Sequence, residues 1–175
     1  IMKGTKTKTL VESSPKQSIK RLLEQSINLP ATEKSAEQNT EPFKRIIFEK
    51  NIFESVCKYL KNYNRICIIT SPKPSEQYLQ FLTNMLNEWN ITYWSYVLES
   101  RVTCDNNIIL KTCAKVKNAD IIVALGTGTI ADISKITAFK LGLPYCVIPT
   151  AISHYGILND VAYMVNDGIP KLLNV

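Results

Sequence analysis

The sequence predicts an α/β fold with a Rossmann-like, largely parallel sheet, helices on both faces and a β-hairpin at the end. From residue 43 onward, short apolar or β-branched runs alternate with longer segments of helical periodicity. One of the apolar runs leads directly into a glycine-containing turn, and the last residues alternate around an Asn-Asp-Gly sequence. Strands and helices that alternate at this spacing are typical of βαβ crossovers, and therefore of parallel sheets.

The 175 residues are enough for one domain with an appendage. Residues 1–41 contain no aromatic residue and are rich in Lys, Ser, Thr, Glu and Gln. We expect them to form a basic arm and linker with one short amphipathic helix around Gln17–Ile27, where apolar residues recur every three or four positions. Residues 42–175 form the predicted α/β domain.

Periodicity and turn signals assign each element of that domain. Ser75 is the expected N-cap of the second helix, and the hairpin is expected to turn through three residues, Asn166–Gly168. The expected strands are 45–49, 66–70, 91–98, 121–125 and 145–149, the expected helices are 52–62, 75–89, 105–117 and 129–141, and the hairpin covers 162–175.

The net charge of +6 is concentrated near the start, with ten Lys/Arg against six Asp/Glu in residues 1–50. Two interpretations stay open: a solvated basic arm, or contact with nucleic acid, an anionic surface or an acidic partner. The arm lacks the interleaved aromatic residues of single-strand binders. No apolar run approaches the roughly 18 residues of a membrane span.

The five cysteines include no C-x-x-C pair, and their odd number argues against a disulfide framework. We therefore expect a reducing compartment, either the cytoplasm or the mitochondrial matrix. The chain begins with Ile1 followed by Met2. This start favours a processed form, a fragment or part of a longer chain, and a basic arm is compatible with a cleaved organellar signal.

The clearest candidate site follows the apolar run Ile121–Leu125, where Gly126-Thr-Gly128 leads into a predicted helix. The N-terminus of a helix presents unpaired N–H groups and the positive end of the helix dipole, which suit a phosphate. The two glycines would let a phosphate approach the backbone. They could equally be present only because the turn from strand to helix is tight.

A second group of polar residues follows the next strand, in Pro149-Thr150-Ala-Ile-Ser153-His154-Tyr155-Gly156. Ligands bind at the carboxyl ends of parallel strands, so we expect the two groups to share one cleft. His154 is the only histidine in the chain. It could be a structural hydrogen-bonding residue or a functional one.

Together these motifs resemble the glycerol-1-phosphate dehydrogenase branch of the dehydroquinate synthase-like, iron-containing alcohol dehydrogenase superfamily. Gly126–Lys135 looks like the triple-glycine turn and its helix, with Asp132 and Lys135 at the Asp and Lys positions. Ala138–Pro149 is similar to the family's continuation, and Pro149–Gly156 to its P-T-x-x-S-H-D-G loop. The resemblance covers about residues 43–175, which correspond to the N-terminal, nucleotide-binding half of the family.

The resemblance implies that residues 42–175 bind NAD or NADP. Ser71, with Lys73 nearby, stands where many relatives place an acidic residue against the adenosine ribose, so NADP is at least as expected as NAD. Lys135 and His154 would face the cleft and are the candidate catalytic residues. The implied cofactor-binding residues are Gly126, Thr127, Gly128, Thr129 and Asp132 at the pyrophosphate turn and its helix, Thr150 and Ser153 near the nicotinamide ribose, and Ser71.

Three departures from the family pattern bear on activity. Thr127 replaces the middle glycine of the turn, and Tyr155 replaces the acidic residue of the His-Asp-Gly loop. The resemblance implies that zinc or iron would be held by a helical C-terminal domain, which we expect to be absent here, and His154, the remaining candidate ligand, cannot hold zinc alone.

We therefore expect a degenerate, dehydrogenase-like domain that acts as a structural or interaction subunit with other protein subunits. The alternative is an active NAD(P)-dependent, metal-assisted dehydrogenase for dihydroxyacetone phosphate, sn-glycerol 1-phosphate or a related polyol. That alternative requires the helical domain, with its zinc or iron, to be supplied elsewhere.

Overall fold

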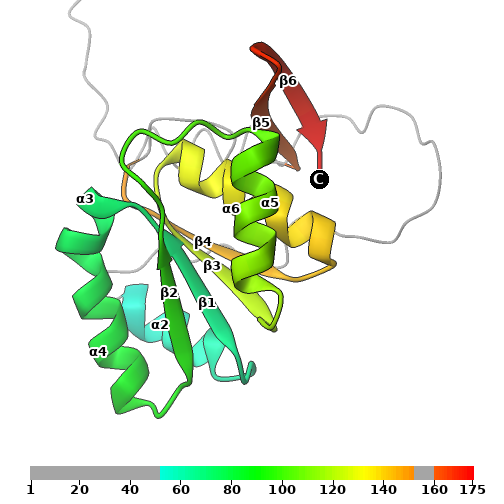
Figure 1. Ribbon diagram of the computed structural model, residues 1–175. Coiled ribbons are helices and arrows are strands. Elements are labelled where there is room, and N and C mark those ends of the chain that lie inside the picture. The colour runs from blue at the N-terminus through cyan, green and yellow to red at the C-terminus, as the bar shows by residue number, and fades with distance from the viewer. Residues whose placement is uncertain (1–51, 152–159) are drawn as a thin grey trace, which may run out of the picture. The chain divides into compact units, whose positions relative to one another are not determined.

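The computed structural model describes residues 52–151 and 160–175, which all belong to one unit of the chain, residues 41–175. The predicted helix 17–27 and strand 45–49 lie outside these residues. The elements are α2 (Ile52–Leu60), β1 (Ile66–Thr70), α3 (Pro72–Pro74), the π-helical turn η1 (Ser75–Leu79), α4 (Gln80–Glu88), β2 (Tyr93–Val97), α5 (Asn106–Val116), β3 (Ile121–Gly126), α6 (Gly128–Leu141), β4 (Tyr145–Pro149), β5 (Val161–Asn166) and β6 (Ile169–Asn174) (Figure 1).

Four parallel strands form the main sheet in the order β2-β1-β3-β4, and β5 and β6 form a separate antiparallel hairpin. The predicted fold class is thus confirmed. The two central strands, β1 and β3, are buried at every position, as expected of strands covered on both faces. The chain leaves β1 toward one side of the sheet and leaves β3 toward the other, so the winding direction reverses between these two strands.

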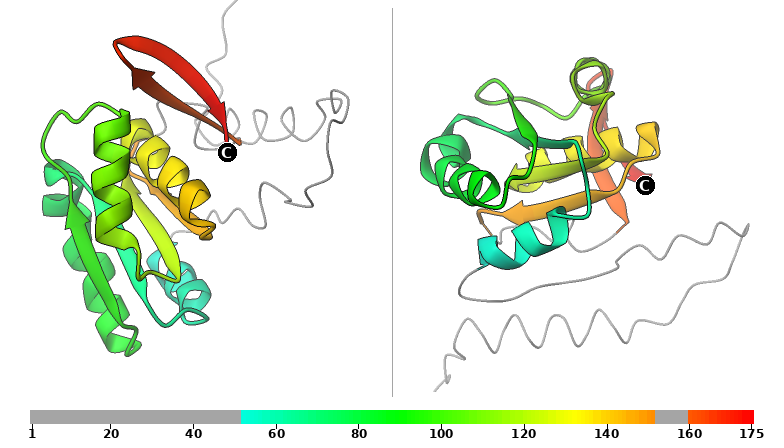
Figure 2. Two further views of the ribbon diagram at one scale, coloured as in Figure 1. Left: turned by 45° about the vertical axis from the view of Figure 1, so that its right-hand side comes forward. Right: turned by 90° about the horizontal axis from the view of Figure 1, so that it is seen from below.

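Helices cover both faces of this sheet. The cores of α2 and α4 pack with Ile66 and Ile68 of β1 on one face. The cores of α5 and α6 pack with Cys67 and Ile69 on the other. Successive residues of a strand point to opposite faces, so one apolar run supplies both cores. Figure 2 shows α2 and α5 on opposite sides of the strands.

The helical segment after β1 begins three residues earlier than predicted, and Ser75 is not its N-cap. Ser71 takes the N-cap position with an extended backbone, and Pro72 is the first helical residue. Proline suits that position because its missing N–H has no partner within a helix anyway. The amide of Ser75 instead donates to the carbonyl of Ser71 at 2.9 Å. The helix therefore starts directly at the carboxyl edge of the sheet.

The hairpin turn was also predicted incorrectly, because it contains two residues rather than three. Asp167 and Gly168 both have positive φ, 51° and 75°, as in a type I′ turn. Asn166 belongs to β5 and pairs with Ile169. The hairpin is joined to the rest of the domain through the amide of Val165, which donates to the carbonyl of Cys104 at 2.7 Å.

None of the helices in the described ranges, 52–151 and 160–175, is long and apolar enough to cross a membrane.

Candidate functional site

The carboxyl ends of β1, β3 and β4 lie side by side at one edge of the sheet. Thr70 pairs with Leu125, and Gly126 pairs with Pro149. The amide of Thr150 donates to the carbonyl of Gly126 at 3.0 Å, which extends the pairing one residue beyond β4. The edge thus brings together three segments that carry predicted site residues, at Ser71, at residues 126–129 and at Thr150.

Thr70 is a residue of this edge that the sequence analysis missed. Its hydroxyl is buried and donates to the carbonyl of Leu125 at 2.8 Å, and its own carbonyl accepts from the amide of Leu98 at 2.8 Å. Thr70 therefore ties the end of β1 to the ends of both neighbouring strands. The sequence feature that could have indicated this role is the position of Thr70, a polar residue directly after the apolar run Ile66–Ile69.

The N-terminus of α6 opens onto this edge without a side-chain cap. Thr127 is the N-cap residue, with extended backbone angles (φ −96°, ψ −170°) and no side-chain hydrogen bond to the helix. The first turn contains no acidic residue, and the side chains of Thr127 and Thr129 are exposed. In contrast, Asp105 closes the start of α5, where its carboxylate accepts from the amide of Ile108 at 2.8 Å. The start of α6 therefore keeps its N–H groups and positive dipole end for an anion.

Gly126 is required by packing. A Cβ at this position would lie 2.8 Å from Cγ1 and 2.9 Å from Cβ of Ile130. Ile130 is in the first turn of α6 and is buried, so its side chain has little room to move. Of the two explanations that the sequence left open, the steric one accounts for this glycine. Close packing between Gly126 and Ile130 places the start of α6 tightly against the end of β3.

Asp132 and Lys135 lie further along α6, and both are buried, with 3 % and 1 % of their surface exposed. The ammonium of Lys135 donates to the carbonyl of Val161, the first residue of β5, at 3.0 Å. Burial lowers the pKa of Lys135, while the negative charges of Asp132 and Asp160 act in the opposite direction. The predicted role of Lys135 was to face the cleft, whereas the structure places its ammonium against the start of the hairpin.

Ser153, His154 and Tyr155 lie outside the described residues, so their predicted roles remain predictions. Within the described ranges, no three or more His, Cys, Asp or Glu side chains lie close enough to hold a metal ion. Burial raises the pKa values of the Cys67 and Cys104 thiols to about 12, which keeps both groups protonated at neutral pH.

The fold and the edge together define a class of protein. This is a doubly wound α/β domain with the strand order 2-1-3-4, and an uncapped helix N-terminus lies at the point where the winding reverses, which is where such sheets bind their ligands. The chain belongs to the iron-containing alcohol dehydrogenase family, whose family model matches residues 47–173.

Curated relatives extend this assignment. The chain is 24 % identical to the NAD(P)+ glycerol-1-phosphate dehydrogenase of Geobacillus stearothermophilus over 139 residues, which cover 75 % of this chain and 34 % of the relative. It is 29 % identical to the enzyme of the same name from Picrophilus torridus over 112 residues, or 64 % of this chain and 31 % of the relative. The chain therefore spans about a third of the length of these relatives.

Solved structures show the same fold. An iron-containing alcohol dehydrogenase from Thermococcus thioreducens matches with a TM-score of 0.67 at 15 % identity, over 75 % of this chain and 42 % of the other. Maleylacetate reductase from Agrobacterium tumefaciens matches with a TM-score of 0.64 at 14 % identity, over 81 % and 40 %. The described residues thus have the same α/β fold as these proteins.

Proposed function

We propose that this chain binds NADP(H) or NAD(H) at the carboxyl edge of β1, β3 and β4, as the nucleotide-binding part of a dehydrogenase of the glycerol-1-phosphate type. The observation that carries the proposal is the uncapped N-terminus of α6 at the point where the sheet reverses its winding. The two curated relatives described above, from Geobacillus stearothermophilus and Picrophilus torridus, are named as NAD(P)+ enzymes, which supports the choice of cofactor.

The strand order indicates how a dinucleotide would lie. Its central pyrophosphate would occupy the first turn of α6, where the amides of Gly128 and Thr129 and the hydroxyl of Thr127 are available as donors. Because β1 and β4 flank β3 on opposite sides, the two nucleosides would extend over the ends of these strands. In this arrangement the adenosine lies near Ser71 and the nicotinamide riboside near Thr150.

Charge at the β1 end favours NADP over NAD. Ser71 is neutral and makes no capping bond with its side chain, and Lys73 is an exposed cation in the following turn. An acidic residue at the end of β1 would accept hydrogen bonds from the ribose hydroxyls of NAD and would repel a 2′-phosphate. The proposal therefore predicts that NADPH binds at least as tightly as NADH, and that Ser71→Asp reverses this order.

A proposal about catalysis has to include the helical, metal-binding half of the family as well as this chain. The match covers only about a third of the length of these relatives, and the implied zinc or iron would be held by the helical half of the family, outside the residues matched here. With that half supplied elsewhere, the assembly would reduce dihydroxyacetone phosphate to sn-glycerol 1-phosphate or act on a related polyol. The second candidate is a structural or interaction subunit that has kept the fold and lost the chemistry, and it rests on Thr127 and Tyr155.

Calorimetric titration with NADPH and NADH tests nucleotide binding. We expect micromolar affinity, and we expect Thr129→Asp to weaken it by tenfold or more because a carboxylate would then face the pyrophosphate. An acidic residue in the first turn stabilises a helix, so this variant should unfold no more easily than the wild-type chain. Thr129→Ser is the matched control and should bind normally.

Two outcomes separate the candidates. No heat at millimolar NADPH and NADH would contradict nucleotide binding and would leave the structural subunit. If the chain binds NADPH, oxidation of NADPH by dihydroxyacetone phosphate, measured with and without a helical metal-binding half from a relative, distinguishes an enzyme domain from a domain that only binds.

A further inference from the structure

The loop between β2 and α5, residues 98–105, follows the carboxyl end of β2 and therefore leaves the sheet at the same edge as the proposed nucleotide site (Figure 1). The last residues of β2 and β1, Val97 and Thr70, are paired. The amide of Leu98 then donates to the carbonyl of Thr70 at 2.8 Å. The loop thus starts directly beside the end of β1, where the adenosine half of the dinucleotide is proposed to lie near Ser71.

Two buried residues fix this loop to the rest of the domain. Leu98 and Cys104 each have 3 % of their surface exposed and belong to the core that α5 and α6 share with the sheet. Between them, Glu99, Ser100 and Arg101 are exposed. Because the segment is short and held at both ends, a side chain near its middle stays close to the edge of the sheet.

Arg101 has a backbone conformation that arginine rarely adopts. Its φ is 64°, which lies in the left-handed region where Gly, Asn and Asp are favoured over other residues. Unfavourable backbone conformations of this kind persist where the surrounding structure imposes them, and they cluster at ligand-binding positions. Among the residues that the structure describes, the guanidinium of Arg101 takes part in no ion pair. Its charge is therefore available to an anionic ligand.

We propose that Arg101 is a specificity-determining residue, which binds the 2′-phosphate of NADP(H) together with Lys73 at the carboxyl ends of β1 and β2. This inference rests on the proposed function and adds a second cation to its preference for NADP. A guanidinium donates two parallel hydrogen bonds to a phosphate, whereas the ammonium of Lys73 acts as a point charge. The exposed acidic residues nearest to these cations along the chain are Glu76 and Glu99, so the proposal also predicts how removal of an opposing charge acts.

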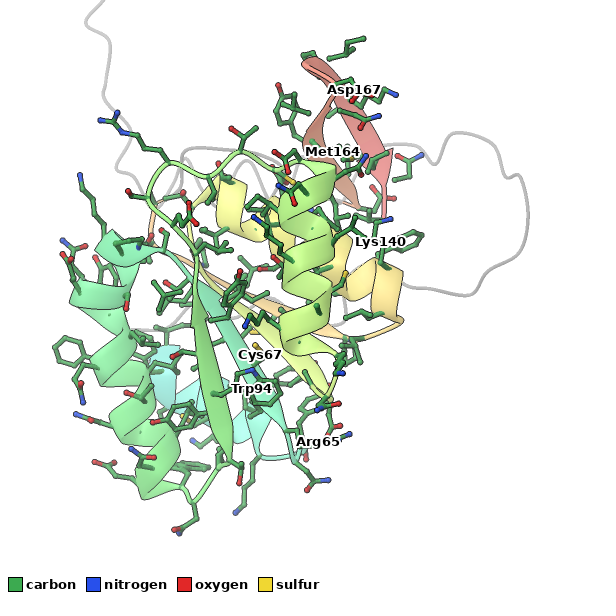
Figure 3. All side chains as sticks on the ribbon, in the orientation of Figure 1. Arg65, Cys67, Trp94, Lys140, Met164 and Asp167 are labelled. Carbon is green, nitrogen blue, oxygen red and sulfur yellow. The ribbon has the colours of Figure 1, made fainter. Side chains whose placement is uncertain are left out.

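The test measures the Kd for NADPH and for NADH by calorimetric titration of four variants. Arg101→Asn removes the charge and places a residue that is favoured at positive φ, so it should be at least as stable as the wild-type chain. Arg101→Lys keeps the charge, and Glu99→Gln removes the opposite charge from the same loop. Lys140→Gln is the control, because Lys140 is exposed in the last turn of α6, at the other end of that helix from the proposed site (Figure 3).

We expect Arg101→Asn to raise the Kd for NADPH by about tenfold, the loss that one hydrogen bond to a charged group can supply, and to change the Kd for NADH by less than about twofold. Arg101→Lys should lose less affinity for NADPH than Arg101→Asn, because it keeps the positive charge. Glu99→Gln and Lys140→Gln should not weaken NADPH binding.

Three results would overturn the assignment of Arg101 to the 2′-phosphate and leave the proposed function intact. These are equal losses for NADPH and NADH, unchanged NADPH binding in Arg101→Asn, and a loss in Glu99→Gln as large as that in Arg101→Asn, which would show that the loop conformation matters and not the charge. If the wild-type chain binds neither NADPH nor NADH, the proposed function fails, and the role of Arg101 fails with it.

Discussion

Replacing Gly126 with alanine should destabilise the domain through a single identifiable clash. The new methyl group would lie 2.8 Å from Cγ1 and 2.9 Å from Cβ of Ile130. Ile130 is buried, and its Cβ is fixed to the helix backbone, so relief requires the first turn of α6 to move away from β3. Overpacking of this kind costs about 1–3 kcal/mol. A less flexible unfolded chain would offset up to about 1 kcal/mol of that cost.

Urea unfolding followed by circular dichroism measures this effect, with Thr127→Ala as the control. Thr127 is exposed and makes no capping bond, so its replacement should change the free energy of unfolding by less than about 0.5 kcal/mol. In an Ile130→Gly background the alanine at position 126 should cost less, because Cβ, Cγ1 and Cγ2 of the isoleucine are all gone. An equal cost in both backgrounds would refute the steric explanation.

Three further predictions concern other parts of the molecule. The Arg65 guanidinium holds the pKa of Asp120 below its usual value. This ion pair therefore stabilises the native state at pH values above the usual pKa of an aspartate, and the stabilisation is lost as the pH falls through the lowered pKa. Asp120→Asn should flatten the acid side of a plot of Tm against pH, and an unchanged plot would count against the pair. Burial raises the pKa values of Cys67 and Cys104 to about 12, so iodoacetamide at neutral pH should label both only after unfolding, and rapid labelling of the native chain would contradict their burial. Gly168→Ala should cost about 1–2 kcal/mol because φ is +75° while no atom lies within 4 Å of the added Cβ, and faster hydrogen exchange confined to the hairpin would show it.

The sheet could be predicted from the sequence because its central strands are buried on both faces. Such strands are short apolar runs bounded by turn residues, as Ile66–Thr70 and Ile121–Gly126 are. Element boundaries were harder to predict where one residue type has two uses. Pro72 can end a segment or begin a helix. The structure shows that it begins one, whereas the predicted helix started at Ser75.

The part of the candidate site that lies at the ends of the strands could be predicted from the sequence. Chain order and parallel pairing are sufficient to bring Ser71, Thr127 and Thr150 to one edge. The contact between Lys135 and Val161 spans 26 residues and depends on where the hairpin packs against α6, which no local pattern encodes. Gly126 was ambiguous for a similar reason, because only the structure shows that Ile130 occupies the space beside it.

Chemical-shift mapping with NADPH on the isotope-labelled chain tests nucleotide binding at the β1–β3–β4 edge most directly. We expect shifts of the amides of Gly126, Gly128 and Thr150. We expect no shift at Arg65, which lies at the opposite ends of the strands (Figure 3), or at its partner Asp120. A spectrum that NADPH leaves unchanged, or shifts that cluster at Arg65 instead, would contradict nucleotide binding at this edge.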